Sequence, residues 1–287
     1  MMAPRESSDG EVFVAVSVNL PAYLERIGFA GSIAPTLDTL TAICRLHPTA
    51  IPFENLNALL GVPVRLDQPS LERKLLLERR GGYCFEHNLL LLHVLLDLGF
   101  VARGLLGRAI TTRPEEANLP LDHMLVAVDL GSATYLADVG FGNATPTSPL
   151  KLKPDLEQDT PHERYRLLGN GPYRLEIERG GSWLPLYAFD LTAREDADYE
   201  APNLWTSTNP EAHFRSRLVA ARAGKDRRHA LHDTVYSIYP TGGEPERRTL
   251  TSVAELREVL SGQFGINLPP AELLDPALAS LLPPADA

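Results

Sequence analysis

Cysteine is scarce in this 287-residue chain, because only Cys44 and Cys84 occur. That number is far below what a disulfide scaffold needs, and the two residues lack the clustered spacing of a zinc site. We therefore expect no metal, and a reducing compartment, the cytoplasm, fits best. Residues 1–10 are polar and lack the apolar region of a secretory signal.

Long apolar runs and an excess of positive charge are missing as well. The most apolar stretch, residues 89–106, is interrupted by charged residues and a glycine, whereas a membrane-spanning helix wants about 20 apolar residues. The chain has 27 basic and 37 acidic residues, for a net charge of −10. This charge opposes the attraction that nucleic acids and anionic membranes exert, so we expect neither partner. With 7% aromatic residues there is no clear dimerisation signal, and a monomer and a weak homodimer stay equally open.

The order of patterns predicts an α+β protein. Apolar residues at helical spacing dominate the first third, and short alternating runs between turn residues follow in the middle, where they indicate an antiparallel sheet or barrel. The expected helices are residues 20–27, 35–46, 71–79, 88–98 and 253–264. The expected strands are residues 100–110, 124–130, 134–139, 165–168, 173–178 and 231–239. The tail from Pro269 is expected to lie on the surface.

The segment from Arg80 to Asn88, RGGYCFEHN, could carry chemistry. Two glycines precede Cys84, which begins an apolar helix, and such a turn can present a thiol at a helix N-terminus. The positive potential there favours the thiolate, the reactive form of cysteine. By itself a cysteine is more often a small buried apolar residue, and we keep that interpretation for Cys44, which lies on an amphipathic helix.

A nucleophilic cysteine needs a base and a group that orients the base. His123 opens one predicted strand and Asp138 lies near the end of the next, so antiparallel pairing could bring imidazole and carboxylate together. Alone, each assignment is weak, since a histidine at a strand edge and an aspartate near a glycine usually have structural roles. His87 and His93 compete as bases because they share a helix with Cys84.

Four segments together resemble the arylamine N-acetyltransferases. They are AIPFENL from Ala50, RGGYCFEHN from Arg80, DHMLV from Asp122 and YLADVGFG from Tyr135, in matching order and separation. The resemblance runs from Leu20 to Phe214. It implies a Cys-His-Asp triad of Cys84, His123 and Asp138 on a core like that of cysteine proteases, the same three residues that the local patterns select.

The resemblance also implies an architecture in three parts. These are an N-terminal helical bundle (1–98) with Cys84, a middle antiparallel β-barrel (99–200) with His123 and Asp138, and a C-terminal α/β lid (201–287). Glu54 and Arg80 each stand beside a motif residue, and we hypothesise an internal ion pair between them near the site.

The implied reaction has two steps. Cys84 takes an acetyl group from acetyl-CoA, a substrate rather than a permanent cofactor, and an aromatic amine, hydrazine or hydroxylamine then attacks the thioester. Phe53, Phe141 and Phe214 would line the acceptor pocket, although ordinary core packing accounts for such residues about equally well.

Gly142 and Thr208 are candidates for contact with coenzyme A, because small residues permit close approach. The stretch from Asn209 to Ala212 departs from the Ser/Thr-His-Pro-x-Ser pattern of relatives, so the donor contacts here are expected to differ.

Three other functions remain open from the sequence. An amide synthase of the same fold, acting on a carrier-bound polyketide, would use the same triad. A cysteine hydrolase or transglutaminase-like protein would clear the acyl-enzyme with water or a peptide amine. A small-molecule binding protein with a relic site would form no acyl-Cys84 at all.

Overall fold

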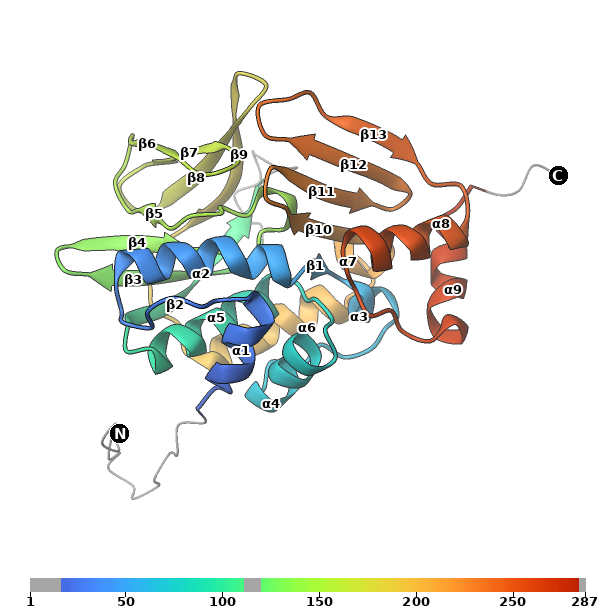
Figure 1. Ribbon diagram of the computed structural model, residues 1–287, viewed down its shortest axis with the longest axis horizontal. Coiled ribbons are helices and arrows are strands. Elements are labelled where there is room, and N and C mark those ends of the chain that lie inside the picture. Colours follow the sequence, from blue (N-terminus) through green and yellow to red (C-terminus); the bar gives the residue numbers. More distant parts are fainter. Residues whose placement is uncertain (1–16, 111–119, 284–287) are drawn as a thin grey trace.

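The computed structural model describes residues 17–110 and 120–283. Helices of the N-terminal part pack beneath two antiparallel sheets, one of eight strands and one of five (Figure 1). This arrangement confirms the α+β class that the sequence predicts. In the described part of the chain, no helix combines the length and apolar character needed to cross a membrane.

The N-terminal helices surround one long helix that is buried on nearly every side. The helices are α1 (Leu20–Ile27), α2 (Leu37–Ala50), α3 (Leu56–Leu59), α4 (Gln68–Leu71) with its π-helical continuation (Glu72–Leu77), and α5 (Cys84–Asp97). Side chains cap three of them: Asn19 accepts from an N–H of α1, Thr36 from one of α2 and Asp67 from one of α4. Helix α5 is apolar around most of its circumference, which is the pattern of a helix inside a core.

The eight-stranded sheet is a nearly closed barrel with the strand order β5-β4-β3-β2-β9-β8-β7-β6. Its strands are β2 (Val101–Ala109), β3 (His123–Leu130), β4 (Ala133–Ala137), β5 (Leu150–Lys151), β6 (Glu157–Asp159), β7 (Arg164–Leu168), β8 (Tyr173–Arg179) and β9 (Ser182–Phe189). The Gln158 side chain on one edge strand accepts from the Lys151 N–H and donates to the Lys151 carbonyl on the other. This side chain therefore bridges the two edges.

The five-stranded sheet combines the two ends of the chain. Its order is β1 (Phe53–Glu54), β10 (Val219–Ala223), β11 (Arg227–His232), β12 (Val235–Pro240) and β13 (Glu246–Thr249). Strand β1 pairs with β10 in the register Phe53↔Ala221. The remaining helices are α6 (Glu200–Thr208), α7 (His213–Ser216), α8 (Val253–Glu258) with its π-helical continuation (Val259–Gln263), and α9 (Ala271–Ala279). Helices α8 and α9 lie beside this sheet at the C-terminal end of the chain (Figure 1).

Two expectations for the C-terminal part are wrong. The single strand predicted over residues 231–239 is the end of β11, a turn and β12, because Asp233 takes a left-handed φ of 50° and reverses the chain. The tail after Pro269 is not purely a surface segment. It forms α9, whose Leu274 and Leu278 are fully buried in the C-terminal core. The two leucines are four residues apart in the sequence, which is helical spacing, but the prolines of this segment favoured a non-helical tail.

Candidate active site

The two glycines before Cys84 lie so close to other atoms that neither position has room for a side chain. A Cβ on Gly81 would lie 2.0 Å from the Pro52 carbonyl oxygen, and a Cβ on Gly82 would lie 2.7 Å from Oε2 of Glu86. Neither glycine has a left-handed φ. Both are therefore required for close packing and not for an unusual backbone conformation.

Helix α5 begins at Cys84 with its first turn tied down by an acidic side chain. Glu86 folds back so that its Oε2 accepts from the Tyr83 N–H (3.1 Å), and Lys74 Nζ donates to its Oε1 (2.6 Å). Cys84 itself is buried, and its thiol donates to the Asp122 carbonyl (3.5 Å). The thiol thus lies at the positive end of the α5 dipole, where a thiolate is favoured.

His123 and Asp138 meet across the β3–β4 hairpin, as the predicted pairing of the strands required. The register Val126↔Ala137, continued by one residue, sets Asp138 opposite Leu125, two residues from His123 along β3. Nε2 of His123 donates to Oδ2 of Asp138 at 2.8 Å. The other carboxylate oxygen accepts from Asn88 Nδ2 (2.9 Å) and from the Gly140 N–H (2.9 Å). The carboxylate is thus held by three donors in a buried setting.

The two buried groups stabilise each other's charge. Burial lowers the pKa of His123, but the charge and hydrogen bond of Asp138, together with Cys84, raise that pKa to about 10 overall. Burial raises the pKa of Asp138, and the opposing effects of His123, Asn88 and Gly140 hold it below its usual range. Cys84 also contributes to the raised pKa of His123, so the thiol lies near the ring that the carboxylate holds.

His87, a competing base, is occupied by a chain of hydrogen bonds with a fixed direction. Its Nε2 faces the Gly82 and Pro52 carbonyls (3.0 and 3.2 Å), which only accept, so Nε2 is the donor. The Nδ1 of His87 then accepts from Nε2 of His47 (2.9 Å). The Nδ1 of His47 in turn accepts from the Tyr23 hydroxyl (2.9 Å). Burial lowers the pKa of His87 to about 4. His87 is therefore a neutral ring with no lone pair for the thiol.

The two remaining candidates from the sequence lie elsewhere. His93 bonds Gln68 through Nδ1, and its Nε2 lies 3.2 Å from Asp196. Cys44 is fully buried, and burial raises the pKa of its thiol. Of the histidines that share α5 with Cys84, neither offers a free ring nitrogen to the sulfur, so His123 is the base that the geometry supports.

A family model described as N-acetyltransferase matches residues 36–273. The chain is 40% identical over 252 residues to an arylamine N-acetyltransferase of Escherichia coli, covering 87% of this chain and 89% of that protein. The chain belongs to the arylamine N-acetyltransferase family. The resemblance found in the four sequence segments is thereby confirmed.

Solved structures agree with this membership. The arylamine N-acetyltransferase of Mycobacterium marinum has a TM-score of 0.88 at 37% identity, covering 92% of this chain and 99% of that one. A structure of the M. marinum enzyme in complex with CoA has a TM-score of 0.88 at 36% identity, covering 92% and 100%. The enzyme of Mycobacterium tuberculosis has a TM-score of 0.87 at 38% identity, covering 91% and 99%.

Aromatic rings surround the His123 side of the site in this family member. The Phe141 ring meets the edge of the His123 ring at a centroid distance of 4.7 Å, and Tyr187 lies 4.6 Å from His123. Phe53 and Phe214 touch each other with centroids 5.9 Å apart. Gly142 connects the two groups, because a Cβ there would lie 3.7 Å from the Phe53 ring. The three predicted phenylalanines and Gly142 therefore form one continuous surface.

Thr208, the other predicted contact of coenzyme A, is exposed near the end of α6. Its hydroxyl donates to the Leu204 carbonyl within the same helix (2.6 Å). The structure does not join this residue to the triad through any contact in the described residues, and its role stays a prediction.

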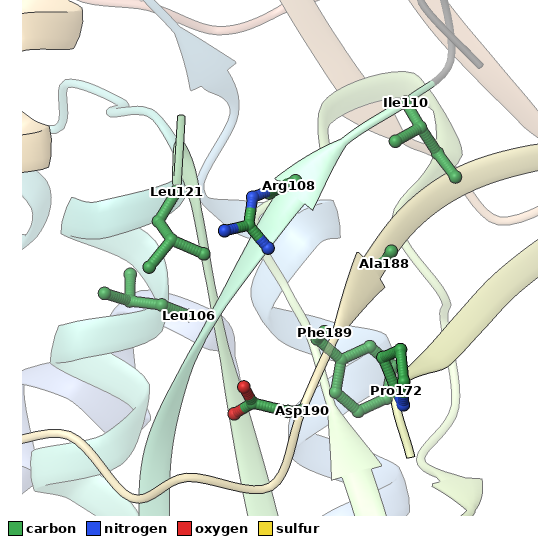
Figure 2. Close-up of a pocket in the computed structure, with 8 residues that line it drawn as sticks. All are labelled: Leu106, Arg108, Ile110, Leu121, Pro172, Ala188, Phe189 and Asp190. Atoms are coloured by element: carbon green, nitrogen blue, oxygen red, sulfur yellow. The ribbon is translucent and has the colours of Figure 1, made fainter. Parts of the chain in front are cut away.

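A cavity of about 200 Å³ lies along β2, close to the strand that carries His123. Leu106 and Arg108 line it and flank Gly107, whose Cα partner on β3 is His123. Figure 2 shows Leu106 and Leu121 on one side of Arg108, with Phe189 and Pro172 on the other. Six of the eight lining residues are apolar, and Arg108 and Asp190 are the charged ones, a composition that suits a ring-bearing ligand.

Two residues of the site were missed in the sequence. Asn88 holds both Asp138 and the β-barrel backbone, since its Nδ2 also donates to the Met124 carbonyl (2.7 Å) and its Oδ1 accepts from the Val139 N–H (3.0 Å). Its position four residues after Cys84, on the same face of a helix, was a usable signal. Tyr187 lies on β9, a strand that was not predicted, and no local pattern pointed to it.

The hypothesised ion pair is confirmed. Arg80 Nη2 lies 2.7 Å from Oε1 of the fully buried Glu54. Oε2 of Glu54 accepts from the Leu56 N–H (2.7 Å), and Arg80 Nη2 donates to Asn57 (3.0 Å). This network joins β1 and α3 to the loop before Cys84. Among residues 17–110 and 120–283, no group of three His, Cys, Asp or Glu side chains could hold a metal ion.

Proposed function

We propose that this chain is an arylamine N-acetyltransferase in which Cys84 carries the acetyl group from acetyl-CoA to the acceptor. The observation that carries this proposal is the buried chain from the Cys84 thiol through His123 to Asp138, at the start of α5. The relatives bear that activity in their names, and an M. marinum relative has a structure in complex with CoA.

In the first half-reaction the Cys84 thiolate attacks the thioester carbonyl of acetyl-CoA. The tetrahedral intermediate expels the CoA thiolate, which takes a proton from the His123 imidazolium, and acetyl-Cys84 remains. Exchange of one thioester for another is close to thermoneutral, so the protein mainly supplies a ready thiolate and correct placement. The raised pKa of His123 favours the imidazolium that this step requires.

In the second half-reaction the acceptor nitrogen attacks acetyl-Cys84. His123, now neutral, takes a proton from that nitrogen, the carbon–sulfur bond breaks, and Cys84 leaves as a thiolate paired with the imidazolium. An aromatic amine suits this step, because its weakly basic nitrogen keeps a lone pair near neutral pH. Hydrazines and hydroxylamines share that property.

The surface formed by Phe53, Phe141, Phe214 and Gly142 would hold the ring of the acceptor beside His123. Gly142 and Thr208 remain the proposed contacts of coenzyme A. A thiol that must stay reduced suits the cytoplasm, and both Cys84 and Cys44 are free. The oligomeric state, monomer or weak homodimer, stays a prediction.

Intact mass spectrometry tests the proposal directly. The wild type should gain one acetyl group on incubation with acetyl-CoA and lose it when an arylamine such as anisidine is added. Cys84→Ala should gain nothing, whereas Cys44→Ala, the matched control, should behave as the wild type. An acetyl shift that persists in Cys84→Ala would overturn the assignment. A shift that water clears but no arylamine accelerates would indicate a hydrolase, and a shift that is stable to both would indicate the amide synthase.

A further inference from the structure

The turn that follows Gly140 places aromatic and glycine residues directly against the site. It consists of Phe141, the 3₁₀ segment Gly142–Ala144 and Thr145. Phe141 contacts the ring of His123, and Gly142 lies against Phe53. A shift of this turn by one ångström would therefore move one wall of the acceptor surface.

Three side chains hold the backbone of this turn from behind. The carbonyl of residue 143 accepts from Arg179 Nη2 (2.7 Å), and that of residue 144 accepts from the Tyr165 hydroxyl (3.1 Å). The carbonyl of residue 145 accepts from Arg228 Nη2 (2.8 Å). Three consecutive peptide groups are thus fixed in orientation, each by a different donor.

One carboxylate, that of Glu163, organises all three donors. It accepts from Arg228 Nε (3.0 Å) and Nη2 (2.7 Å), and from Arg179 Nη2 (2.9 Å). The Tyr165 hydroxyl lies 3.5 Å from its Oε2. Glu163 therefore contacts all three of the side chains that bond the backbone of the turn.

Glu163 and its three partners join the two sheets. Glu163 and Tyr165 lie at the start of β7, and Arg179 ends β8, all in the barrel, whereas Arg228 comes from β11 of the five-stranded sheet. Arg228 is 1% exposed, so its charge has no solvent to compensate it. Burial raises the pKa of Glu163, and the two guanidinium groups hold it below its usual range, so the carboxylate is ionised at neutral pH.

We propose that Glu163 is a positioning residue for the acceptor half-reaction, acting through Arg228, Arg179 and Tyr165 on the turn that carries Phe141. This inference rests on the proposed function. Glu163 touches no reacting atom. It fixes where Phe141 meets His123, and hence where the acceptor ring must lie for its nitrogen to reach acetyl-Cys84.

Glu163→Gln tests this proposal. The amide keeps the shape of the carboxylate but loses its charge, and its NH₂ group must face one of the guanidinium groups that the carboxylate had bound. The matched control is Glu176→Gln, which removes a buried carboxylate from the same barrel. Glu176 binds Arg166 through two hydrogen bonds (2.8 and 2.7 Å) that do not involve the turn.

The two half-reactions are measured separately. A small activated ester, p-nitrophenyl acetate, loads Cys84 without coenzyme A, and the release of p-nitrophenol gives the acylation rate. The decay of acetyl-Cys84 with anisidine, followed by mass spectrometry, gives the second half-reaction. For Glu163→Gln we expect loading within about twofold of the wild type and aminolysis about tenfold slower, since a lost hydrogen bond to a charged group is worth at least that factor. Glu176→Gln should match the wild type in both.

A second variant, Arg179→Met, should slow aminolysis by an intermediate amount. Within the turn, Arg179→Met releases only the carbonyl of residue 143; it also removes the Arg179–Glu163 bond but keeps the buried Arg228–Glu163 pair. It should therefore slow aminolysis by a smaller factor in the same direction. Unchanged aminolysis in both variants, with normal loading of Cys84, would overturn the positioning role and leave the proposed function intact. If Glu163→Gln lowers only the melting temperature and not the aminolysis rate of the folded enzyme, Glu163 is purely structural. Loss of loading in all proteins, wild type included, would instead count against the proposed function.

Discussion

Gly140 and Cys84 are in direct backbone contact, because a Cβ added to Gly140 would lie 3.0 Å from the Cα of Cys84. The same atom would lie 2.9 Å from Asn88 Nδ2 and 3.1 Å from the Cβ of His87. Gly140 therefore sets how closely the loop that carries Asp138 approaches the first turn of α5, and with it the distance from His123 to the thiol.

Gly140→Ala should separate these two elements. We expect a loss of stability of about 1 to 3 kcal/mol from overpacking and a fall in kcat of at least about tenfold, because the triad opens. Steady-state kinetics below the melting temperature measure the second effect. Gly262→Ala is the control, since a Cβ there meets nothing within 4 Å. Full activity of Gly140→Ala would show that the contact is not needed.

Asp138→Asn should change the reactivity of Cys84 with pH. The substitution removes the charge that raises the pKa of His123, so less imidazolium is present at pH 7 to hold the thiolate. We expect slower alkylation of Cys84 by iodoacetamide at pH 7 than in the wild type. The fall in kcat should be about 10³- to 10⁴-fold.

The control for this profile is Asp129→Asn, on the same hairpin. Asp129 bonds Thr134 and Arg103 and lies away from the thiol. Its alkylation profile should overlay that of the wild type. An unshifted profile in Asp138→Asn would mean that another group sets the thiolate population.

The stability of the protein should depend on the protonation of His123. Its folded pKa of about 10 lies above the ordinary value of 6.5, so the folded state binds the proton more tightly than the unfolded state. The resulting stabilisation is complete below about pH 6.5 and is lost as the pH rises through about 10. In the Cys84→Ala background the part of the raised pKa that Cys84 contributes is lost, and the larger part that Asp138 contributes remains.

In Cys84→Ala we expect the free energy of unfolding, from urea titrations at pH 6, 8 and 10, to fall as the pH rises, because Asp138 still holds the pKa of His123 above its ordinary value. The double variant Cys84→Ala, His123→Gln should lose much less over this range. Parallel curves for the two proteins would contradict the raised pKa.

Glu54→Ala should leave Arg80 buried without its carboxylate. Breaking such a pair from one side costs about 3 to 5 kcal/mol, which thermal unfolding would show as a clear drop in melting temperature. The control is Glu157→Ala, whose pair with Arg164 is about half exposed on both sides and should contribute little, because water screens it. An unchanged melting temperature in Glu54→Ala would count against the structural role.

The sequence predicted the parts of the site that local patterns carry. A glycine pair before a cysteine, and a histidine and an aspartate on neighbouring strands, made Cys84, His123 and Asp138 candidates, and the four motif segments together selected them; the structure joins His123 to Asp138. The positions of Glu54 and Arg80, each beside a motif residue, led to the ion-pair hypothesis that the structure confirms. These features depend on spacing along the chain, which a sequence displays directly.

The remaining features depend on pairing between distant segments. Glu163 precedes β7, Arg179 ends β8 and Arg228 lies on β11 of the other sheet, and nothing in their neighbours in sequence distinguishes them from surface charges. The tautomer of His87 follows only from the carbonyls it meets in space. The reason for Gly81 and Gly82 also differs from the expectation, because the glycines avoid collisions with Pro52 and Glu86 rather than permit a special φ.

Strand β1 has one further consequence, for the order in which the protein can become active. This two-residue strand is held by β10, and Asn55 Oδ1 accepts from the Val219 N–H, 164 residues further along the chain. The ribosome therefore releases Cys84 and the whole N-terminal bundle well before the strand that fixes Phe53 and Glu54 exists. A nascent chain would carry its nucleophile unassembled and acquire the ability to transfer acetyl groups only near the end of synthesis.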